Sequence, residues 1–447
     1  MRTRIRTETR PSTLFVALPV LLAAALPREA RAEPCVPSAG APCDWEERVS
    51  AQPDLKTILQ AIEARNPDLR EAQARALAAD ARAGAAGGLP DLELKGELWG
   101  VPLSHPVSFS MADTIMVGLR QAFPAWGSLD ARERAARADA QAVEDGARSR
   151  RQEIAAQARR AFATYYRTDH EIRLHLEHAG LTSRLLETTR AQYELGRGTQ
   201  QDNLRLQAEL SRLHAEVTTV EQQRASARAL LNTLMNRPAD ARLGPSPEIP
   251  VADLLAAKDD GRPAESERAL DERRPELLAA ARAVSRTEAT LDASKREATY
   301  PTVMVGADYW YMPTLPMSHG YGAMLTVSLP WLNRRHADEV RSAERTLVAE
   351  RSALEAQRAS ARFQLHDAAA KVRAARAALE ILHGRVLPDA RRAYEAAEAQ
   401  VQAGHGNVPA LIESARAYLG ARIDEVRAVA ELEASRADYA RAAGEAQ

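Results

Sequence analysis

The chain has 447 residues and a formal net charge of −1 at pH 7, with 4% aromatic and 27% charged residues. So few aromatic side chains argue against a compact enzyme core and favour extended helical packing. Without residues 1–32 the net charge becomes about −5, so the charge gives no indication of nucleic acid as a partner.

The N-terminus has the pattern of a secretory signal peptide. Four arginines precede an apolar run from Leu14 to Leu26, and Ala30-Arg31-Ala32 supplies small residues for cleavage. We therefore predict that residues 1–32 are a signal peptide and that the mature chain is exported. No later segment approaches the roughly 18 uncharged apolar residues that a membrane-spanning helix needs.

A polar leader over residues 33–54 follows, and it contains the only two cysteines, Cys35 and Cys43. Because an exported protein folds in an oxidising compartment, we expect a disulfide between them. Lipid attachment to Cys35 is the alternative interpretation. It would need a leucine and small residues directly before the cysteine, where this chain has Ala32-Glu33-Pro34.

A first repeat is predicted over residues 55–236. It opens with an amphipathic helical segment from Leu55 to Ala86, which Pro67 kinks or restarts. Alternation of apolar and polar residues at a period of two predicts a strand at 92–98 and another at 114–123.

Two long helical arms follow these strands and meet at the glycine turn Leu195-Gly196-Arg197-Gly198-Thr199. The first arm, Ser128 to Leu195, contains no proline and would span ~100 Å at about 1.5 Å per residue. Apolar residues on the return arm follow alternating steps of four and three, which is the spacing of a coiled-coil seam. The seam residues are Leu206, Leu210, Leu213, Val217, Val220, Ala227, Leu231 and Leu234, and only Arg224 breaks the series.

A Pro-rich connection, residues 237–267, separates this repeat from a second one over residues 268–447. The second repeat has the same order: a helix, strands at 303–311 and 321–329, and a long helical pair that turns at Ala403-Gly404-His405-Gly406-Asn407. Matching prolines and glycines in the two copies are offset by 206 to 211 residues, which indicates an internal two-fold repeat. The second seam is Ala361, Leu365, Ala368, Val372, Ala375, Leu379, Leu382 and Val386, continued by Ile412, Ala415, Leu419, Val426 and Val429.

Four strands per chain cannot close into a membrane barrel, because the smallest such barrels use about eight strands and lipid does not tolerate an open edge. Closure would require partner chains. Aromatic residues gather in or beside the strands, as the interfacial girdles of a barrel require. The girdle candidates are Trp99, Trp126, Tyr309, Trp310, Tyr311, Tyr321 and Trp331. The alternative is a periplasmic sheet in which these side chains form a core.

Several short segments carry a resemblance to a known family. They are Arg65-Asn66-Pro67-Asp68-Leu69, Leu119-Arg120-Gln121-Ala122-Phe123-Pro124 and Tyr193-Glu194-Leu195-Gly196-Arg197-Gly198. Together with the duplication, they make the chain resemble the TolC-like outer membrane efflux proteins over nearly its whole mature length. The segment from Phe109-Ser110-Met111 through Phe123-Pro124, with the loop Met312-Pro313-Thr314-Leu315-Pro316-Met317, looks most like the heavy-metal efflux branch of that family.

The pattern predicts an α+β chain, mainly long α-helical coiled coils with four β-strands. The resemblance implies a homotrimer whose strands form an outer membrane β-barrel, continued by an α-helical barrel that crosses the periplasm. It implies a duct rather than an enzyme, namely the channel of a tripartite efflux pump or type I secretion system that exports small molecules or metal ions. Its partners would be a periplasmic adaptor, an inner-membrane pump of the RND type and outer membrane lipid. On the residues alone, a periplasmic coiled-coil tether is the alternative.

In the family, the turns at the ends of the long helices meet the adaptor. The resemblance therefore assigns adaptor docking to both glycine turns, 195–199 and 403–407. Arg197 would be a permanently charged donor and His405 a titratable one, which would make the two contacts inequivalent. Simple helix-hairpin turns without a docking role are the alternative.

One helical segment contains residues of metal-ligating types. Glu171, His175 and His178 share a helix face at steps of four and three and could bind a divalent ion. A solvated coiled-coil face is the favoured interpretation. His170 and His175 are five residues apart, so they do not share a face as the histidines of a zinc protease motif do.

A second group of soft ligands lies in the loop between the last two strands. Met312, Met317 and His319 are of the kind that suits monovalent copper. An outward loop with incidental methionines is the alternative. We expect no catalytic residues and no resident cofactor.

Overall fold

The computed structural model of the chain describes residues 43–101, 112–196, 198–256, 263–312, 319–403 and 408–445. Trp45–Gln447 forms one compact unit, separate from Met1–Asp44. The predicted signal peptide and Cys35 lie outside the described residues, and Cys43 is described only as the first residue of a helix. The disulfide therefore stays a prediction.

The elements follow the predicted order. The first repeat contains α1 (Cys43–Ala51), α2 (Leu55–Arg65), α3 (Pro67–Ala86), β1 (Glu93–Trp99), β2 (Thr114–Phe123), α4 (Ser128–Glu194) and α5 (Gln200–Leu234). The next two helices are α6 (Val251–Ala256) and α7 (Pro263–Arg273). The second repeat contains α8 (Pro275–Thr299), β3 (Val303–Tyr311), β4 (His319–Val327), the 3-10 turn η2 (Pro330–Leu332), α9 (Arg334–Ile381), the π-helical turn η3 (Leu382–Val386), α10 (Leu387–Gln402) and α11 (Val408–Ala443). The duplicated sequence of helix, strand pair and long hairpin is confirmed.

Asn66 explains why a proline restarts the first helical segment. This residue ends α2, and its Oδ1 accepts a hydrogen bond from the Leu69 backbone N–H at 3.1 Å, which caps α3. Pro67 occupies the first helical position, where no intrahelical N–H donor is needed. The Asn66 Nδ2 donates to the Leu234 carbonyl at 2.8 Å, so the restart is also fixed to the end of α5.

The four strands form one antiparallel sheet in the order β1-β2-β3-β4. The central pairing, β2 with β3, joins the two repeats. Strand β4 begins and ends two residues earlier than predicted. The pairing stops at Ser328, whose Oγ accepts a hydrogen bond from the Thr302 N–H at 3.0 Å, and Pro330 then starts a helical turn.

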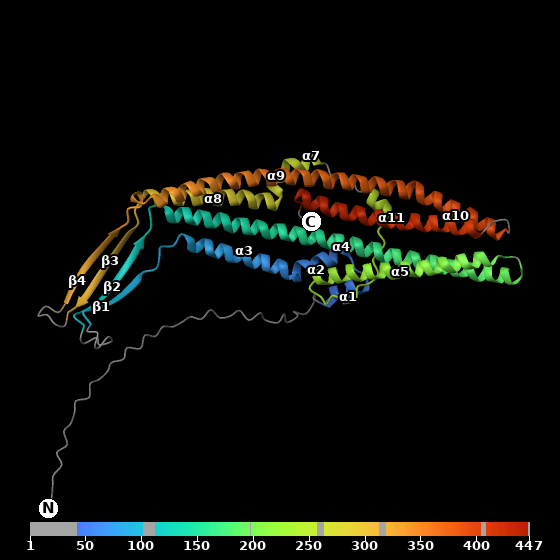
Figure 1. Cartoon of the computed structure of the whole chain (residues 1–447), viewed down its shortest axis with the longest axis horizontal. Coiled ribbons are helices and arrows are strands. Elements are labelled where there is room, and N and C mark those ends of the chain that lie inside the picture. The colour runs from blue at the N-terminus through green and yellow to red at the C-terminus, as the bar shows by residue number, and fades with distance from the viewer. Residues whose placement is uncertain are drawn as a thin grey trace, which may run out of the picture. The chain divides into compact units, whose positions relative to one another are not determined.

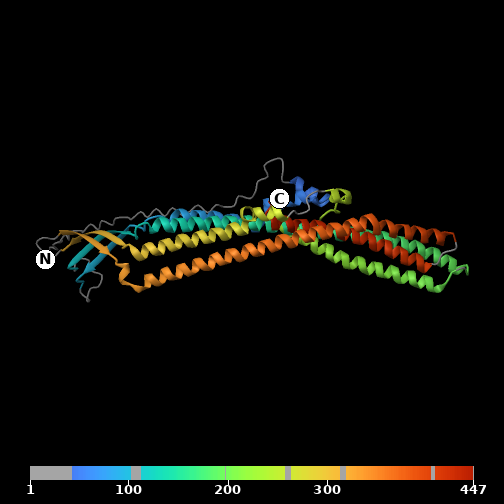
Figure 2. The same cartoon turned by 90° about the horizontal axis from the view of Figure 1, so that it is seen from above.

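The sheet lies at one end of the long helices, and the ends of α4 and α10, which lead into the two hairpin turns, lie at the other (Figure 1). Helix α4 runs between these ends and packs against α3, α8, α5 and α11 along its length. Figure 2 shows the same helices side by side from a second direction. None of the described helices combines the length and the apolar character needed to span a bilayer.

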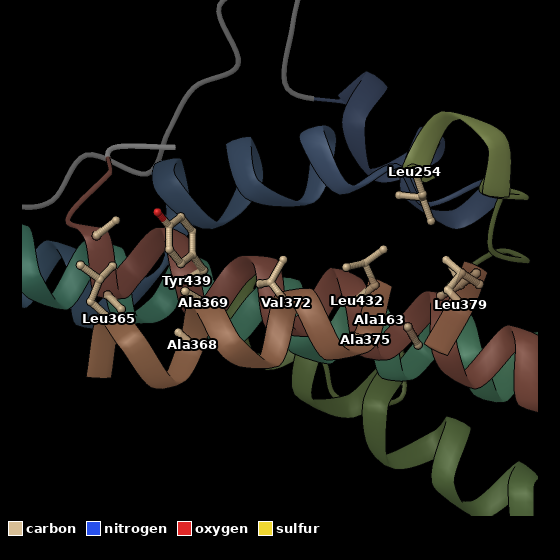
Figure 3. Close-up of a cluster of buried hydrophobic side chains, with 14 of the residues drawn as sticks. Ala163, Leu254, Leu365, Ala368, Ala369, Val372, Ala375, Leu379, Leu432 and Tyr439 are labelled. Carbon is tan, nitrogen blue, oxygen red and sulfur yellow. The ribbon is translucent and has the colours of Figure 1, made fainter. Parts of the chain in front are cut away.

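On α5 and α9 the predicted seams form most of the buried core of the hairpins, whereas on α11 Leu419 and Val429 are buried but Ile412, Ala415 and Val426 are only half-buried. On α5 every seam residue is buried except Leu210, which is half-buried. In the second hairpin, Leu365, Val372 and Leu379 of α9 belong to one buried cluster with Leu432 of α11 (Figure 3). The alanines labelled in that cluster add little volume, so the helices can approach closely.

The predicted seam is wrong at its last position before the turn, because Val386 is 40% exposed. Residues Leu382–Val386 form a π-helical turn, in which the Leu387 N–H donates to the Leu382 carbonyl. Pro388 has no N–H, so an α-helical bond from this residue cannot form. The extra residue in the turn rotates the following side chains out of the seam.

The Pro-rich connection contains helical structure that the sequence analysis did not predict. Helix α6 lies within it, and Leu254 of α6 is buried against the α9–α11 cluster (Figure 3). Helix α7 begins at Pro263, also inside the predicted connection. The connection is therefore anchored to the helical core at α6.

Candidate functional site

The sheet has one apolar face, and most of its side chains are exposed. Because directly opposite residues of an antiparallel pair project to the same side, the register assigns each strand residue to a face. The apolar face consists of Leu94, Leu98, Ile115, Val117, Leu119, Phe123, Val303, Val305, Ala307, Tyr309, Tyr311, Tyr321, Ala323, Leu325 and Val327, with Gly96, Gln121 and His319. Leu94 is 75% exposed and Leu325 is 68% exposed. An exposed apolar surface of this extent indicates that something other than water covers it.

The opposite side is a polar face, most of whose side chains are half-buried. It consists of Glu93, Lys95, Glu97, Trp99, Thr114, Met116, Gly118, Arg120, Ala122, Met304, Gly306, Asp308, Trp310, Gly320, Gly322, Met324 and Thr326. The Trp310 indole lies against Gly320 and Gly322, where a Cβ on either glycine would collide with the ring. The usual pattern of a water-soluble sheet, with apolar side chains inside and charged ones outside, is therefore reversed.

The predicted girdle residues fall into three groups. Tyr309, Tyr311 and Tyr321 lie on the apolar face, near the end of the sheet away from the helices. Trp126 and Trp331 are exposed beside the helical junction.

The third group, Trp99 and Trp310, lies on the polar face. Trp99 Nε1 donates to Glu97 Oε2 at 3.1 Å, which confirms that Trp99 shares a side with the charged residues. Strand alternation could have revealed this placement from the sequence, because Trp310 stands two residues after Asp308 and between two tyrosines.

The first glycine turn lies at the end of the α4–α5 hairpin. Leu195 is exposed, and Gly196 adopts a φ of +71°, a left-handed conformation that glycine takes without steric cost. A Cβ at Gly198 would press on the Tyr193 backbone nitrogen at 3.1 Å, so this glycine allows a close turn. Thr199 caps α5, since its Oγ1 accepts a hydrogen bond from the Asp202 N–H at 3.2 Å.

The second glycine turn is described only at its start, where Ala403 follows α10. Gly404, His405, Gly406 and Asn407 lie outside the described residues, as does Arg197 of the first turn. The docking role of both turns stays a prediction.

Arg224, the break in the predicted α5 seam, has a defined partner. Its Nη1 donates to Asp169 Oδ1 at 3.1 Å, and Asp169 Oδ2 accepts a hydrogen bond from the Ser246 backbone N–H at 3.1 Å. Asp169 is buried, and a buried carboxylate needs such donors. The break in the seam is therefore an ion pair that joins α4, α5 and the segment after α5.

Two buried carboxylates connect the first hairpin to the second, and the sequence analysis did not identify this contact. Glu209 of α5, which is 1% exposed, accepts a hydrogen bond from Arg416 of α11 at 2.9 Å and one from Arg212 at 3.1 Å. Glu171 of α4, also 1% exposed, accepts one from Arg427 of α11 at 2.8 Å. Burial alone would raise the pKa of Glu209, but the arginine hydrogen bonds outweigh it and lower the pKa.

The solvated-face interpretation of Glu171, His175 and His178 is wrong, because all three side chains are buried where α11 covers α4. His175 Nδ1 lies 3.3 Å from a Glu216 carboxylate oxygen. Burial lowers the pKa of His175 and of His178, so both imidazoles are neutral at pH 7. No three His, Cys, Asp or Glu side chains come close enough to hold a metal ion within the described part of the chain.

The predicted loop site is only partly described, because residues 313–318, which include Met317, lie outside the described residues. The His319 Nδ1 is hydrogen-bonded to the Tyr309 hydroxyl, and its ring centroid is 5.1 Å from that of Tyr311. Met312 directly follows β3 and is half-buried. Metal contact at this loop stays a prediction.

Solved structures share this fold at low sequence identity. CusC is 16% identical with a TM-score of 0.76, and the alignment covers 92% of this chain and 96% of CusC. VceC from Vibrio cholerae is 16% identical with a TM-score of 0.73, covering 91% of this chain and 99% of VceC. MtrE from Neisseria gonorrhoeae is 19% identical with a TM-score of 0.69, covering 88% of this chain and 89% of MtrE.

These solved structures establish the fold, and a match at the level of sequence goes further. No curated protein matches this sequence. A family model described as outer membrane efflux protein, however, matches residues 58–237 and again residues 267–445. The matched segments cover most of the chain and reproduce its duplication. The chain therefore belongs to the outer membrane efflux protein family.

Proposed function

We propose that this protein is the outer membrane channel of a tripartite efflux pump, a duct through the outer membrane and the periplasm. The observation that carries the proposal is the exposed apolar face of the sheet at one end of two long helical hairpins. Lipid is the medium that covers such a face in a membrane barrel, while the opposite, polar face lines the interior.

The edges of the sheet support a homotrimer. Within the described residues, β1 and β4 each pair with one neighbour and have one free edge. Lipid does not tolerate open edges, so further strands must pair with both of them. Three copies, with β4 of one beside β1 of the next, would give twelve strands in a closed barrel.

The aromatic side chains support a particular depth in the membrane. From the row of Phe123 and Val303 to the row of Ile115 and Tyr311, the strands advance by eight residues. At ~3.4 Å per residue this is about 27 Å along the strand, close to the height of the apolar band of a barrel once tilt is included. We assign the interfacial girdles to Tyr309, Tyr311 and Tyr321 at one level, and to Trp126 and Trp331 at the other.

The hairpin turns are the surfaces that we assign to the periplasmic adaptor, and through it to an inner-membrane pump of the RND type. The ends of α4 and α10, which lead into these turns, are the parts of the long helices farthest from the sheet (Figure 1). A type I secretion system would use the same surfaces. The cargo would be small molecules or metal ions.

A periplasmic tether is the rival function. It would account for the long hairpins but not for a sheet whose apolar face is exposed, and family membership favours the channel. We assign no catalytic role, because the family is one of efflux proteins.

Fractionation and conductance test the proposal together. The mature protein should sediment with the outer membrane, run as a trimer in mild detergent and give stepwise ion conductance in planar bilayers. A monomer in the periplasmic fraction that gives no conductance would contradict the channel function and favour the tether function.

A further inference from the structure

Methionine is unevenly distributed along this chain. Six of its eight methionines fall in or beside the strands, although helices make up most of the chain. These six are Met111, Met116, Met304, Met312, Met317 and Met324. The other two are Met1 and Met235, and Met235 is fully buried in the helical core.

All three methionines within the strands lie on the polar face. Met116 is opposite Trp310, Met324 is opposite Gly306, and Met304 is opposite Thr326. In the described strands the apolar face carries leucine, valine, isoleucine, phenylalanine and tyrosine but no methionine. If these methionines served only as apolar side chains, we would expect them on the apolar face.

Met304 and Met324 are diagonal neighbours on adjacent strands. Such positions lie about 7–8 Å apart, which two long side chains can bridge. The glycine at the crossing point matters, because the Met324 Cε lies 3.3 Å from where a Gly306 Cβ would be. Without a side chain at Gly306, Met324 can extend over β3 toward its neighbour.

Carboxylates accompany the thioethers on this face. Asp308 is the next polar-face residue after Gly306 on β3, and its Oδ1 is buried without a hydrogen-bond donor among the described residues. The nearest cation, Arg120 Nη2, is 3.9 Å away. Farther along, Glu97 is directly opposite Met116. Thioethers are ligands for soft monovalent ions, and a carboxylate can balance the positive charge.

We propose that Met304 and Met324, with Met116 farther along the same face, bind a soft monovalent metal ion, Cu(I) or Ag(I). The three methionines belong to three strands and to different levels along them, with the Asp308 row between Met324 and Met116, and this is the direction in which a barrel conducts. The inference rests on the proposed function, in which the polar face lines the lumen, and it names the class of cargo.

Silver binding to the purified full-length mature trimer tests this inference. Ag(I) is the probe, because it undergoes no redox change, and the titration uses chloride-free detergent buffer with the cysteines oxidised. We expect the double variant Met304→Leu/Met324→Leu to bind Ag(I) at least about tenfold more weakly than the unaltered protein. Met235→Leu is the matched control, since it removes a thioether from the helical core and should leave the affinity unchanged.

X-ray absorption of the silver-loaded, unaltered trimer gives a readout that depends on no variant. Silver–sulfur scattering is expected, and it should diminish in the double variant. Binding without silver–sulfur scattering, or equal affinities of the unaltered and doubly substituted proteins, would overturn the site.

Bilayer conductance of the same preparations tests the channel function separately from the metal site. Conductance with no effect of the methionines on silver binding would defeat the metal site and leave the channel intact. A trimer that binds silver through sulfur but never conducts would defeat the channel, and with it the interpretation of silver as cargo.

Discussion

The sheet and the helical hairpins follow opposite rules of burial. In the hairpins, seam residues such as Leu213 and Leu365 are fully buried, while most charged side chains are exposed or half-buried. In the sheet, Leu325 and Tyr321 are exposed, while Asp308 and Arg120 are mostly covered. Hydrophobic burial within one chain thus accounts for the hairpins. The sheet is held by its hydrogen-bond ladder and needs a different medium around its apolar face.

The largest effect should come from placing a charge on the apolar face. Leu119 lies in the central row of the sheet, opposite Ala307. A lysine at the bilayer midplane costs about 2–4 kcal/mol, so Leu119→Lys should strongly reduce the amount of trimer in the outer membrane fraction. The control is Thr326→Lys on the polar face, which should insert normally. Equal insertion of both variants would show that lipid does not cover the apolar face.

In the hairpins, the free energy of unfolding should fall by about 3 kcal/mol when a buried carboxylate loses its partner. Arg416→Leu removes the α11 donor from buried Glu209 and should lower the free energy of unfolding by this amount, with Arg212 limiting the loss. The matched control, Arg422→Leu, breaks a pair with Glu177 that is half-exposed and should cost under about 1 kcal/mol. Denaturant unfolding measures both, and equal losses would contradict the importance of burial.

A smaller and opposite-signed pair of effects is expected from two glycines of the first hairpin. Gly196 has positive φ and open space around it, so Gly196→Ala should destabilise by about 1 kcal/mol through backbone strain alone. Gly146 lies inside α4 with nothing near its missing Cβ, so Gly146→Ala should stabilise by about 0.5–1 kcal/mol. Thermal unfolding would show shifts in opposite directions; a Gly196→Ala variant that is no less stable than the unaltered protein would contradict the left-handed turn.

The smallest effect concerns pH. Burial lowers the folded-state pKa of His178 below its ordinary 6.5, so the unfolded chain binds a proton more readily. Stability should therefore be constant above about pH 6.5 and fall as the pH drops below it toward the folded-state pKa. His178→Gln should flatten this part of the stability curve. A curve of unchanged slope in that variant would assign the loss to other groups.

The sequence predicted those parts of the fold that depend on local signals. Heptad spacing located both seams, Pro67 located a helix start, and period-two alternation located all four strands. The burial of Glu171 and Glu209 could not be predicted in this way. It arises because α11, more than 200 residues away along the chain, covers them with arginines that look like ordinary surface residues in sequence.

The same limit applies to the candidate sites. The turns and strands were located correctly, but Val386 left the seam because of a proline two residues later, and Trp310 sits on the polar face with the charged residues. Both outcomes have local causes, a proline in the first case and strand alternation in the second. Counting heptads or aromatic residues takes neither into account. The docking role of the turns depends on a partner, and neither sequence pattern nor a single chain can test it.

The π-helical turn at Leu382–Val386 also bears on the history of the duplication. Gly196 follows Pro124 by 72 positions in the first copy, and Gly404 follows Pro330 by 74 positions in the second. A π turn accommodates one additional residue while backbone hydrogen bonding continues. The π turn accounts for one of the two additional residues of the second copy, so part of the difference in length lies inside a helix, where an added residue is absorbed as a change of helical phase.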